Sequence, residues 1–302
     1  MPTSQTTNPT GTSDKPAGRS AGGKGTGAHK KSRAVAFLWG LVRIVVVVIL
    51  IFGIWKLVTV VFQVQDFILP APEDVLVGMY ESAGSLLNHT LTTLGEVALG
   101  FVIAAILGLA VSVMMTASDR VARVIYPVLV ASQTVPKVAI APLLVVWFGF
   151  GSGPIIIIVV IMSFFPITIS SAVGLREVPR DLIMLGHSMG FTGLRLFRKI
   201  MFPYALGSVF AGMKVGMTLA LIGSIVGEFV SGQSGLGYYI LASSSAFNVA
   251  LTFGGIIAVV ILGLALFKGV EIAERLMMPW RDEQSPLMAK KKARNKTRLV
   301  KS

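Results

Sequence analysis

Few residues of this chain are of the types that catalyse reactions or bind metals, and their spacing brings no such set together. The 302 residues include no cysteine, which excludes disulfides, thiolate metal sites and cysteine nucleophiles. The histidines His29, His89 and His187 fall in three different regions, so we expect no two of them to share a metal. The stretch Gly18–Lys24 resembles a phosphate-binding loop, but Gly25 stands where a magnesium-binding serine or threonine is required. The sequence therefore predicts no catalytic residue, no metal site and no cofactor.

Polar side chains inside otherwise apolar stretches are the stronger chemical signal. Ser132, Gln133 and Lys137 stand among three prolines in one such stretch. Each proline removes a backbone N–H, so the freed carbonyl groups need partners from neighbouring helices, hydroxyls or water. A lysine at membrane depth is also costly unless it is paired or hydrated. We predict that these three side chains line a translocation pathway; the alternative is a kink that serves packing alone.

Glu228 is a second polar residue at the end of an apolar stretch. It comes just before the uncharged segment SGQSGLGYY, which we expect to be flexible. One interpretation makes Glu228 a residue of the pathway, beside a gate. The other makes it a structural carboxylate that accepts hydrogen bonds from backbone amides.

These residues lie in a chain whose composition is that of a polytopic membrane protein. Hydrophobic residues make up 54% of it and charged residues only 14%. An α-helix of roughly 20 apolar residues crosses a bilayer core about 30 Å thick. The fold class predicted is all-α, with about six transmembrane helices, at Ala34–Phe62, Thr93–Met115, Ile125–Phe148, Pro154–Val173, Leu206–Val230 and Thr252–Ile272.

The distribution of Lys and Arg predicts how these helices are oriented. The net charge is +13, but the basic residues gather in alternate loops and at both ends, which is not the footprint of a nucleic-acid-binding protein. The positive-inside rule places both termini in the cytoplasm. We divide the chain into a disordered basic tail (1–33), an N-terminal transmembrane helix (34–68), a core (69–281) and a second basic cytoplasmic tail (282–302). Lys214, in the cytoplasmic half of the fifth span, is expected to extend towards the surface.

A polar segment at 176–203 interrupts the core on the cytoplasmic side. Its pattern predicts two short amphipathic helices, the first from about Arg180 to Met189. Gly190 then breaks the helix, and the second helix is expected to end before Pro203. An amphipathic hairpin in water indicates a protein partner; the alternative is a loop that lies on the lipid surface.

The fifth span carries small residues at four-residue spacing, which brings them to one face of a helix. These residues are Gly212, Gly216, Ala220 and Ser224. Such a face permits close approach of another helix, so we predict a helix-packing contact there.

The polar segment also resembles a known motif. Gly190, followed at an interval by Phe202 and Pro203, is similar to the EAA loop of ABC-importer permeases. The three positions of the Glu-Ala-Ala triplet read Met184, Leu185 and Gly186 here, and Phe202 replaces a leucine. Longer similarities to the nitrate/sulfonate/taurine subfamily of MetI-like permeases run in order along the chain: LPAPEDVL at Leu69–Leu76, VPKVAIAPLLVVWFGFG at Val135–Gly151, FFPITISSAVGLREVPRDL at Phe164–Leu182, GSIVGEFVSGQSGLGYYI at Gly223–Ile240 and MMPW at Met277–Trp280.

The resemblance implies an importer subunit in the bacterial inner membrane that is not itself an enzyme. Its implied partners are two cytoplasmic ATPase subunits, a second permease copy in a homodimer, an extracytoplasmic binding protein and the lipid bilayer. The segment 176–203 is then the coupling-helix hairpin, inserted in a groove of the ATPase. The residues expected to contact or shape that interface are Leu182, Leu185, Gly186, Met189, Gly190, Phe191 and Pro203.

The substrate implied is a small solute. The segments between 174 and 240 are most similar to permeases for thiamine-precursor pyrimidines or riboflavin, within the broader nitrate/sulfonate/taurine group. The alternative function is an ion-coupled secondary transporter. That class requires coupling-ion carboxylates at mid-membrane and usually an internal repeat, which we do not find in the sequence.

Overall fold

The computed structural model describes residues 46, 47 and 49–280. The chain divides into two units, Met1–Leu57 and Val58–Ser302, and the boundary falls within an apolar helix, Ile49–Val61. The predicted tails 1–33 and 282–302, and residues 34–45 of the predicted first span, lie outside the described residues.

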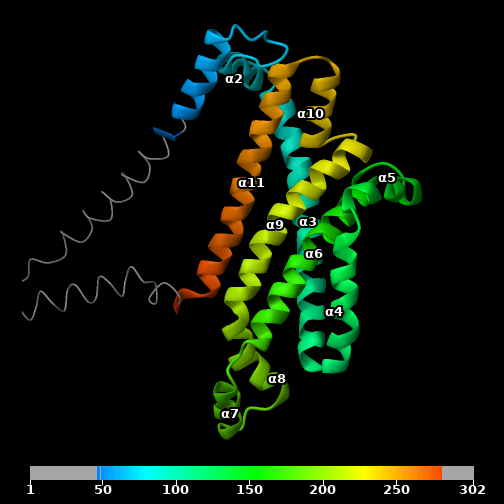
Figure 1. The fold of residues 1–302 in the computed structure, drawn as a ribbon, viewed down its shortest axis with the longest axis vertical. Coiled ribbons are helices and arrows are strands. Elements are labelled where there is room, and N and C mark those ends of the chain that lie inside the picture. The colour runs from blue at the N-terminus through cyan, green and yellow to red at the C-terminus, as the bar shows by residue number, and fades with distance from the viewer. Residues whose placement is uncertain (1–45, 48, 281–302) are drawn as a thin grey trace, which may run out of the picture. The chain divides into compact units, whose positions relative to one another are not determined.

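All regular secondary structure in the described residues of the second unit is helical (Figure 1). Four helices there are long and apolar enough to cross a membrane, or five if one bent pair is counted as a single span. The elements are α2 (Pro72–Glu81), α3 (Ala83–Ala117), α4 (Asp119–Thr134), α5 (Lys137–Phe148), α6 (Ser152–Arg176), α7 (Arg180–Ser188), α8 (Gly193–Leu196), the π-helical η1 (Phe197–Met201), α9 (Phe202–Ser231), α10 (Leu236–Ser245) and α11 (Val249–Met277).

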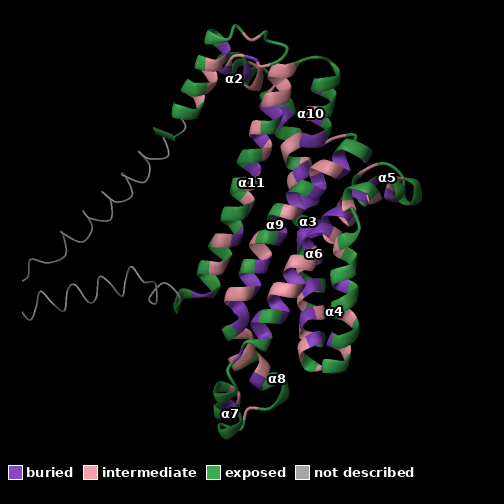
Figure 2. Ribbon diagram, in the orientation of Figure 1, coloured by how far each residue is buried: buried purple, intermediate pink, exposed green. Residues whose placement is uncertain are grey.

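The core of this unit lies where α3, α6 and α9 pack together, and Figure 2 shows buried residues concentrated along α6 and α9. Glycines of α9 make the contact close. A Cβ atom at Gly212 would lie 2.6 Å from the Cβ of Ser170 and 2.8 Å from the carbonyl oxygen of Pro166, both on α6. At Gly216, one turn later, it would lie 2.9 Å from Ile167. Small residues therefore set the distance between these two helices.

The predicted third span, Ile125–Phe148, is not one helix. Its first part belongs to α4 and its second part is α5, and the two are bent by 93°. The break follows from Pro136, which has no N–H, and from Val135 before it, which takes an extended conformation (φ −75°, ψ 123°). Pro127 and Pro142 remain inside their helices.

The prediction that a helix ends before Pro203 is wrong. Gly193–Ser231 runs as a single helical stretch of 39 residues, and its continuity depends on η1. Pro203 stands in the first turn of α9, where a backbone N–H is not needed for helix formation. The wider turns of the π-helical segment precede the proline and lead the chain into α9.

The segment after Glu228 is also more ordered than we expected. After a short loop, it forms α10, a helix that starts at Leu236 and buries Leu236, Gly237, Tyr239 and Ser243. Figure 1 shows α10 at the end of the bundle opposite to α7 and α8. The two ends of α9 therefore lead to two different structural features, the hairpin at one end and α10 at the other.

Candidate functional site

The hairpin of α7 and α8 is closed by a turn that depends on two glycines. Gly190 has φ +76° and Gly193 has φ +49°, in the left-handed region that side chains disfavour. The N–H of Gly190 donates to the carbonyl of His187 at 2.9 Å, and the N–H of Phe191 donates to that of Gly186, also at 2.9 Å. These bonds satisfy the last carbonyls of α7 and reverse the chain direction.

One face of α7 packs tightly against the second arm of the hairpin. Gly186 is buried, and a Cβ atom there would lie 2.5 Å from the side chains of both Leu196 and Ile200. Gly186 thus lies inside the hairpin and holds its two arms close. Leu196, which lies against Gly186 in this contact, is 8% exposed.

Elsewhere on the hairpin, apolar side chains are exposed. Leu182, Leu185 and Met189 from the predicted set are exposed, by 36%, 56% and 60%. The structure adds Met184 (59%) and Leu194 (71%), which the resemblance had not selected. Exposed apolar side chains grouped in this way indicate an interaction surface.

Basic residues surround this surface, and the other two predicted residues lie at its margins. Arg180, Arg195, Arg198 and Lys199 are exposed on the hairpin, while Phe191 is half-buried at the turn. Pro203 is half-buried in α9, beyond the hairpin. The contact of all these residues with a partner stays a prediction.

The hairpin is connected firmly to the bundle at both of its ends. At its start, the Arg176 guanidinium donates to the carbonyl of Met115 at 2.9 Å and lies 3.9 Å from the carboxylate of Asp119. Val178, between Arg176 and α7, is 6% exposed. At its end, the hairpin continues through η1 into α9. The hairpin is therefore joined to α6 by the three residues 177–179 and to α9 by η1.

The predicted pathway residues Ser132, Gln133 and Lys137 lie together at the bend between α4 and α5. The Lys137 ammonium group donates to the Gln133 Oε1 atom at 2.5 Å, and it lies 6.0 Å from the centre of the Phe165 ring. Ser132 donates to the carbonyl of Leu129 at 2.7 Å. The Gln133 Nε2 atom is buried with no hydrogen-bond partner within the described part of the chain. The bend thus gathers polar groups next to the apolar helix α5.

Glu228, the fourth predicted pathway residue, is 1% exposed and lies between α3, α9 and α10. A backbone N–H and two hydroxyl groups donate to its carboxylate. This geometry matches the second interpretation given above, a capped structural carboxylate. Ser224, from the predicted packing stripe, is one of the hydroxyl donors, and Ala220 is fully buried one turn earlier.

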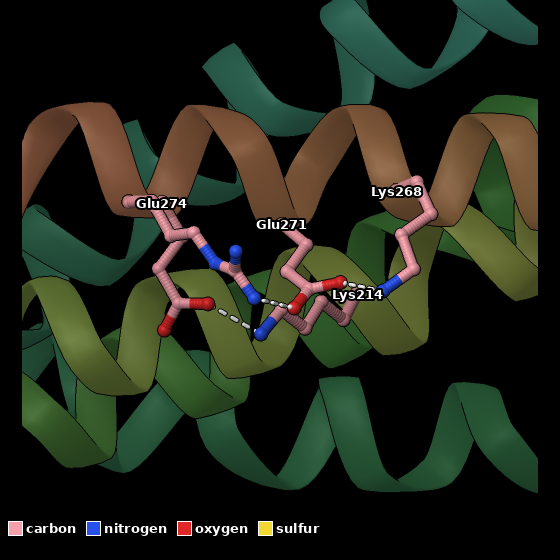
Figure 3. A network of polar contacts seen from close by, with 5 residues as sticks. Lys214, Lys268, Glu271 and Glu274 are labelled. Atoms are coloured by element: carbon pink, nitrogen blue, oxygen red, sulfur yellow. Dashed lines mark hydrogen bonds and ion pairs between the residues drawn. The ribbon is translucent and has the colours of Figure 1, made fainter. Parts of the chain in front are cut away.

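An ion-pair network joins α9 to α11 (Figure 3). Lys214 of α9 pairs with Glu274 of α11, and their side chains are only 25% and 13% exposed. This pairing replaces the surface-directed orientation that we expected for Lys214. Nearby on α11, Glu271 accepts from Lys268 and, at 2.6 Å, from Arg275. The sequence signal for Glu274 as a partner was weak, because the two residues are 60 positions apart.

We expect Lys214→Met to lower the thermal stability of the detergent-purified protein. The substitution removes the ion pair between Lys214 and Glu274 from a mostly buried place, and breaking such a pair costs about 3 kcal/mol. The double variant Lys214→Met/Glu274→Leu removes both charges and should recover most of the loss. Lys268→Met is the matched control, because Lys268 is 65% exposed and its pair contributes little. Equal melting temperatures for Lys214→Met and Lys268→Met would contradict the prediction.

Comparisons with known proteins agree with the fold. Residues 100–280 match the family described as binding-protein-dependent transport system inner membrane component. The formylaminopyrimidine transport permease protein of Halalkalibacterium halodurans is 34% identical over 221 residues, covering 73% of this chain and 88% of that protein. The riboflavin transport system permease protein of Chloroflexus aurantiacus is 33% identical over 246 residues, covering 81% and 92%.

A solved structure, an inward-facing conformation of the MetNI methionine ABC transporter, has the same fold. It superposes with a TM-score of 0.58 at 19% identity, covering 65% of this chain and 98% of that one. The chain belongs to the binding-protein-dependent transport system inner membrane components, the membrane-spanning permeases of ABC importers.

Proposed function

We propose that this permease moves a small solute inward from an extracytoplasmic binding protein, and that two ATPase subunits drive it by docking on the hairpin of α7 and α8. The observation that carries the proposal is the exposed apolar surface of the hairpin. Exposed apolar side chains such as Leu185, Met189 and Leu194 are stabilised when a partner covers them. The hairpin is joined to α6 by a short connection and to α9 through η1, which makes it suitable for transmitting force.

The ATPase contact is proposed to centre on Leu182, Leu185 and Met189, with Phe191 at its edge. Gly186 and Gly190 shape the hairpin from within, and Pro203 starts the helix that carries force into the bundle. Because α9 has 30 residues, it extends about 45 Å from the hairpin, enough to cross the apolar core of a bilayer. Closure of the ATPase subunits would thus act on the far side of the membrane through a single helix.

A second copy of the permease is proposed to face α4 and α5. These helices expose large apolar side chains, among them Val128 (63%), Val138 (53%) and Val146 (79%), next to the polar bend at Gln133 and Lys137. A homodimer would place the two bends across a common path. In this arrangement Ser132, Gln133 and Lys137 supply its polar lining.

The side of the membrane follows from the loop charges. The hairpin carries arginines and a lysine, whereas the segment from Ser231 to Leu251 carries neither residue type, so the positive-inside rule assigns the hairpin to the cytoplasm. The loops at the opposite end would then receive the binding protein. Both termini are proposed to be cytoplasmic.

The proposed substrate class is a small nitrogen heterocycle. Two relatives that are at least 33% identical are named as permeases for formylaminopyrimidine and for riboflavin. The choice of compound would depend largely on the binding protein. We therefore expect this permease to share the chemical class of substrate with these relatives, rather than the same compound.

The test is uptake into vesicles that contain this chain and its ATPase subunits, with ATP inside and the binding protein outside. Radiolabelled riboflavin and formylaminopyrimidine are the two probes. We expect uptake of one of them that requires ATP and persists when ion gradients are collapsed. Uptake that continues without ATP while an ion gradient is held would contradict the proposal and favour a secondary transporter. ATP-driven uptake of taurine alone would keep the mechanism and reject the substrate class.

A further inference from the structure

A buried polar cluster holds the start of α10 in place. Glu228 accepts hydrogen bonds from the Thr93 hydroxyl at 2.7 Å, from the Ser224 hydroxyl at 3.1 Å and from the N–H of Gly237 at 2.5 Å. Thr93 belongs to α3, Ser224 and Glu228 to α9, and Gly237 to α10. Thr93, Ser224 and Glu228 are each exposed by 1% or less. The Glu228 carboxyl group, on α9, thus also bonds to residues of α3 and α10.

Two more backbone amides at the start of α10 bond to side chains of α3. The N–H of Leu236 donates to the Thr93 Oγ1 atom at 2.8 Å, and the N–H of Gly235 donates to the His89 Nδ1 atom at 3.1 Å. Three successive amides are therefore satisfied by side chains of other helices. The first turn of a helix has no partners of its own for such amides, so these side chains determine where α10 begins.

The backbone around Glu228 is shaped to fit its carboxyl group. Gly235 has φ +102°, and a Cβ atom there would lie 2.6 Å from each carboxyl oxygen of Glu228. At Gly237 a Cβ atom would lie 2.9 Å from the Cβ of Glu228 and 3.0 Å from its Oε2 atom. Any side chain at either position would displace the carboxyl group. The backbone at Gly235 and Gly237 therefore lies in direct contact with the Glu228 side chain.

Glu96 is a second buried acid in the cluster, but it does not hold the loop. It is 5% exposed, and its Oε2 atom lies 3.4 Å from the Ser224 hydroxyl, which is closer to Glu228. None of the three amides at 235–237 donates to Glu96. The seating of α10 therefore depends on Glu228 and Thr93.

We propose that Glu228 is a positioning residue that seats α10 on α3, through Thr93, at the outer end of the translocation pathway. The outer location and the link to transport rest on the proposed function; the seating itself does not. Because α9 carries the hairpin at one end and Glu228 near the other, movement of the hairpin reaches α10 through this carboxylate. The role is distinct from lining the pathway, since the carboxylate is closed off from solvent.

The packing of α10 on α3 can be followed with a single reporter thiol. It has no cysteine, so Ser243→Cys introduces a single thiol, on α10, at a position that is 8% exposed. The full chain in lipid nanodiscs is treated with N-ethylmaleimide, and the rate of labelling measures how often α10 leaves its seat. Neither the ATPase nor a substrate is needed. A failure here is therefore distinguishable from a failure of the proposed function.

The decisive comparison is between two substitutions of Thr93 in the Ser243→Cys background. Thr93→Val keeps the shape but removes the hydroxyl, so the N–H of Leu236 loses its acceptor and Glu228 loses a donor. We expect labelling to become about tenfold faster, because an unsatisfied buried polar group destabilises the seated state. Thr93→Ser keeps the hydroxyl and should restore a rate within about twofold of the parent.

Substitutions of Glu228 extend the comparison. Glu228→Ala should speed labelling at least as much as Thr93→Val, and Glu228→Gln should have an intermediate effect because it keeps the size and one acceptor oxygen. Gly95→Ala is the control on α3, since a Cβ atom there would meet nothing within 4 Å. If Glu228→Ala does not yield folded protein, the pair of Thr93 variants still decides. Equal labelling rates for Thr93→Val and Thr93→Ser would overturn the proposal.

Discussion

Replacing Leu185 with aspartate is expected to leave the permease inserted and folded but unable to co-purify with its ATPase. The Leu185 side chain is 56% exposed on the outer face of α7, so its loss removes no core contact. If an ATPase groove covers it, the substitution places a carboxylate in an apolar contact, and such central positions commonly cost about 2 kcal/mol or more. Binding should weaken by at least about 30-fold.

Ser188→Asp is the matched control for charge. Ser188 is exposed on the same helix, and its replacement adds the same negative charge at a polar position. Affinity purification through a tag on the permease, followed by quantification of the ATPase, measures both variants. Undiminished recovery of the ATPase with Leu185→Asp would remove the hairpin surface from the interface, and would favour a hairpin that lies on lipid.

The turn of the hairpin provides an independent variant of the same prediction. Gly190→Pro is incompatible with φ +76°, because proline fixes φ near −65°, and it removes the N–H that bonds to His187. Gly190→Asn should be tolerated, because asparagine enters the left-handed region more readily than other residues. Loss of ATPase recovery with proline but not with asparagine would identify the shape of the turn as the requirement.

The sequence is sufficient to predict the long helices and the position of the hairpin, because both depend on local composition. A run of roughly 20 or more apolar residues is enough to predict α3, α6, α9 and α11. A polar segment between two such runs is expected to lie outside the membrane, because its polar groups are costly to place in the bilayer. The hairpin's tip was predictable for the same reason, since Gly190 marks a break that a helix pattern makes visible.

Prolines show where local signals fail. Pro127, Pro136 and Pro142 all lie in the predicted third span, yet only Pro136 ends a helix. Pro203 carries the same chemistry and starts α9 within a continuous helical stretch. A proline lacks a backbone N–H wherever it stands. Whether the helix stops depends on what else satisfies the freed carbonyl groups, and that is a property of the packed bundle.

Partnerships between distant residues also exceed what the sequence contains. Glu228 gave a clear signal as an acid near the end of a span, but Thr93 lies 135 residues away and is an ordinary helical threonine on inspection. The same is true of the ion pair between Lys214 and Glu274, which are also far apart in the sequence. Their pairing requires the crossing of α9 with α11, which loop charges and hydropathy do not determine.

Gly212→Val is expected to destabilise the permease strongly, because it forces α9 away from α6. A Cβ atom at Gly212 would lie 2.8 Å from the carbonyl oxygen of Pro166, a backbone atom that no change of rotamer moves away. Overpacking of this kind costs about 1–3 kcal/mol, and the branched valine adds its two γ-methyl groups to the clash. We expect a markedly lower apparent melting temperature for the detergent-purified protein.

Gly269→Ala separates this clash from the general effect of replacing a helical glycine. Gly269 lies in α11, and a Cβ atom there would meet nothing within 4 Å. Alanine is favoured over glycine in a helix by about 1 kcal/mol, so this control should be neutral or slightly stabilising. The contrast matters for the proposed mechanism as well, because α9 would transmit force from the hairpin only while it stays packed on α6. If the Gly212→Val protein has the same melting temperature as the parent, the two helices can move apart at little cost in free energy. In that case α9 would not transmit force efficiently.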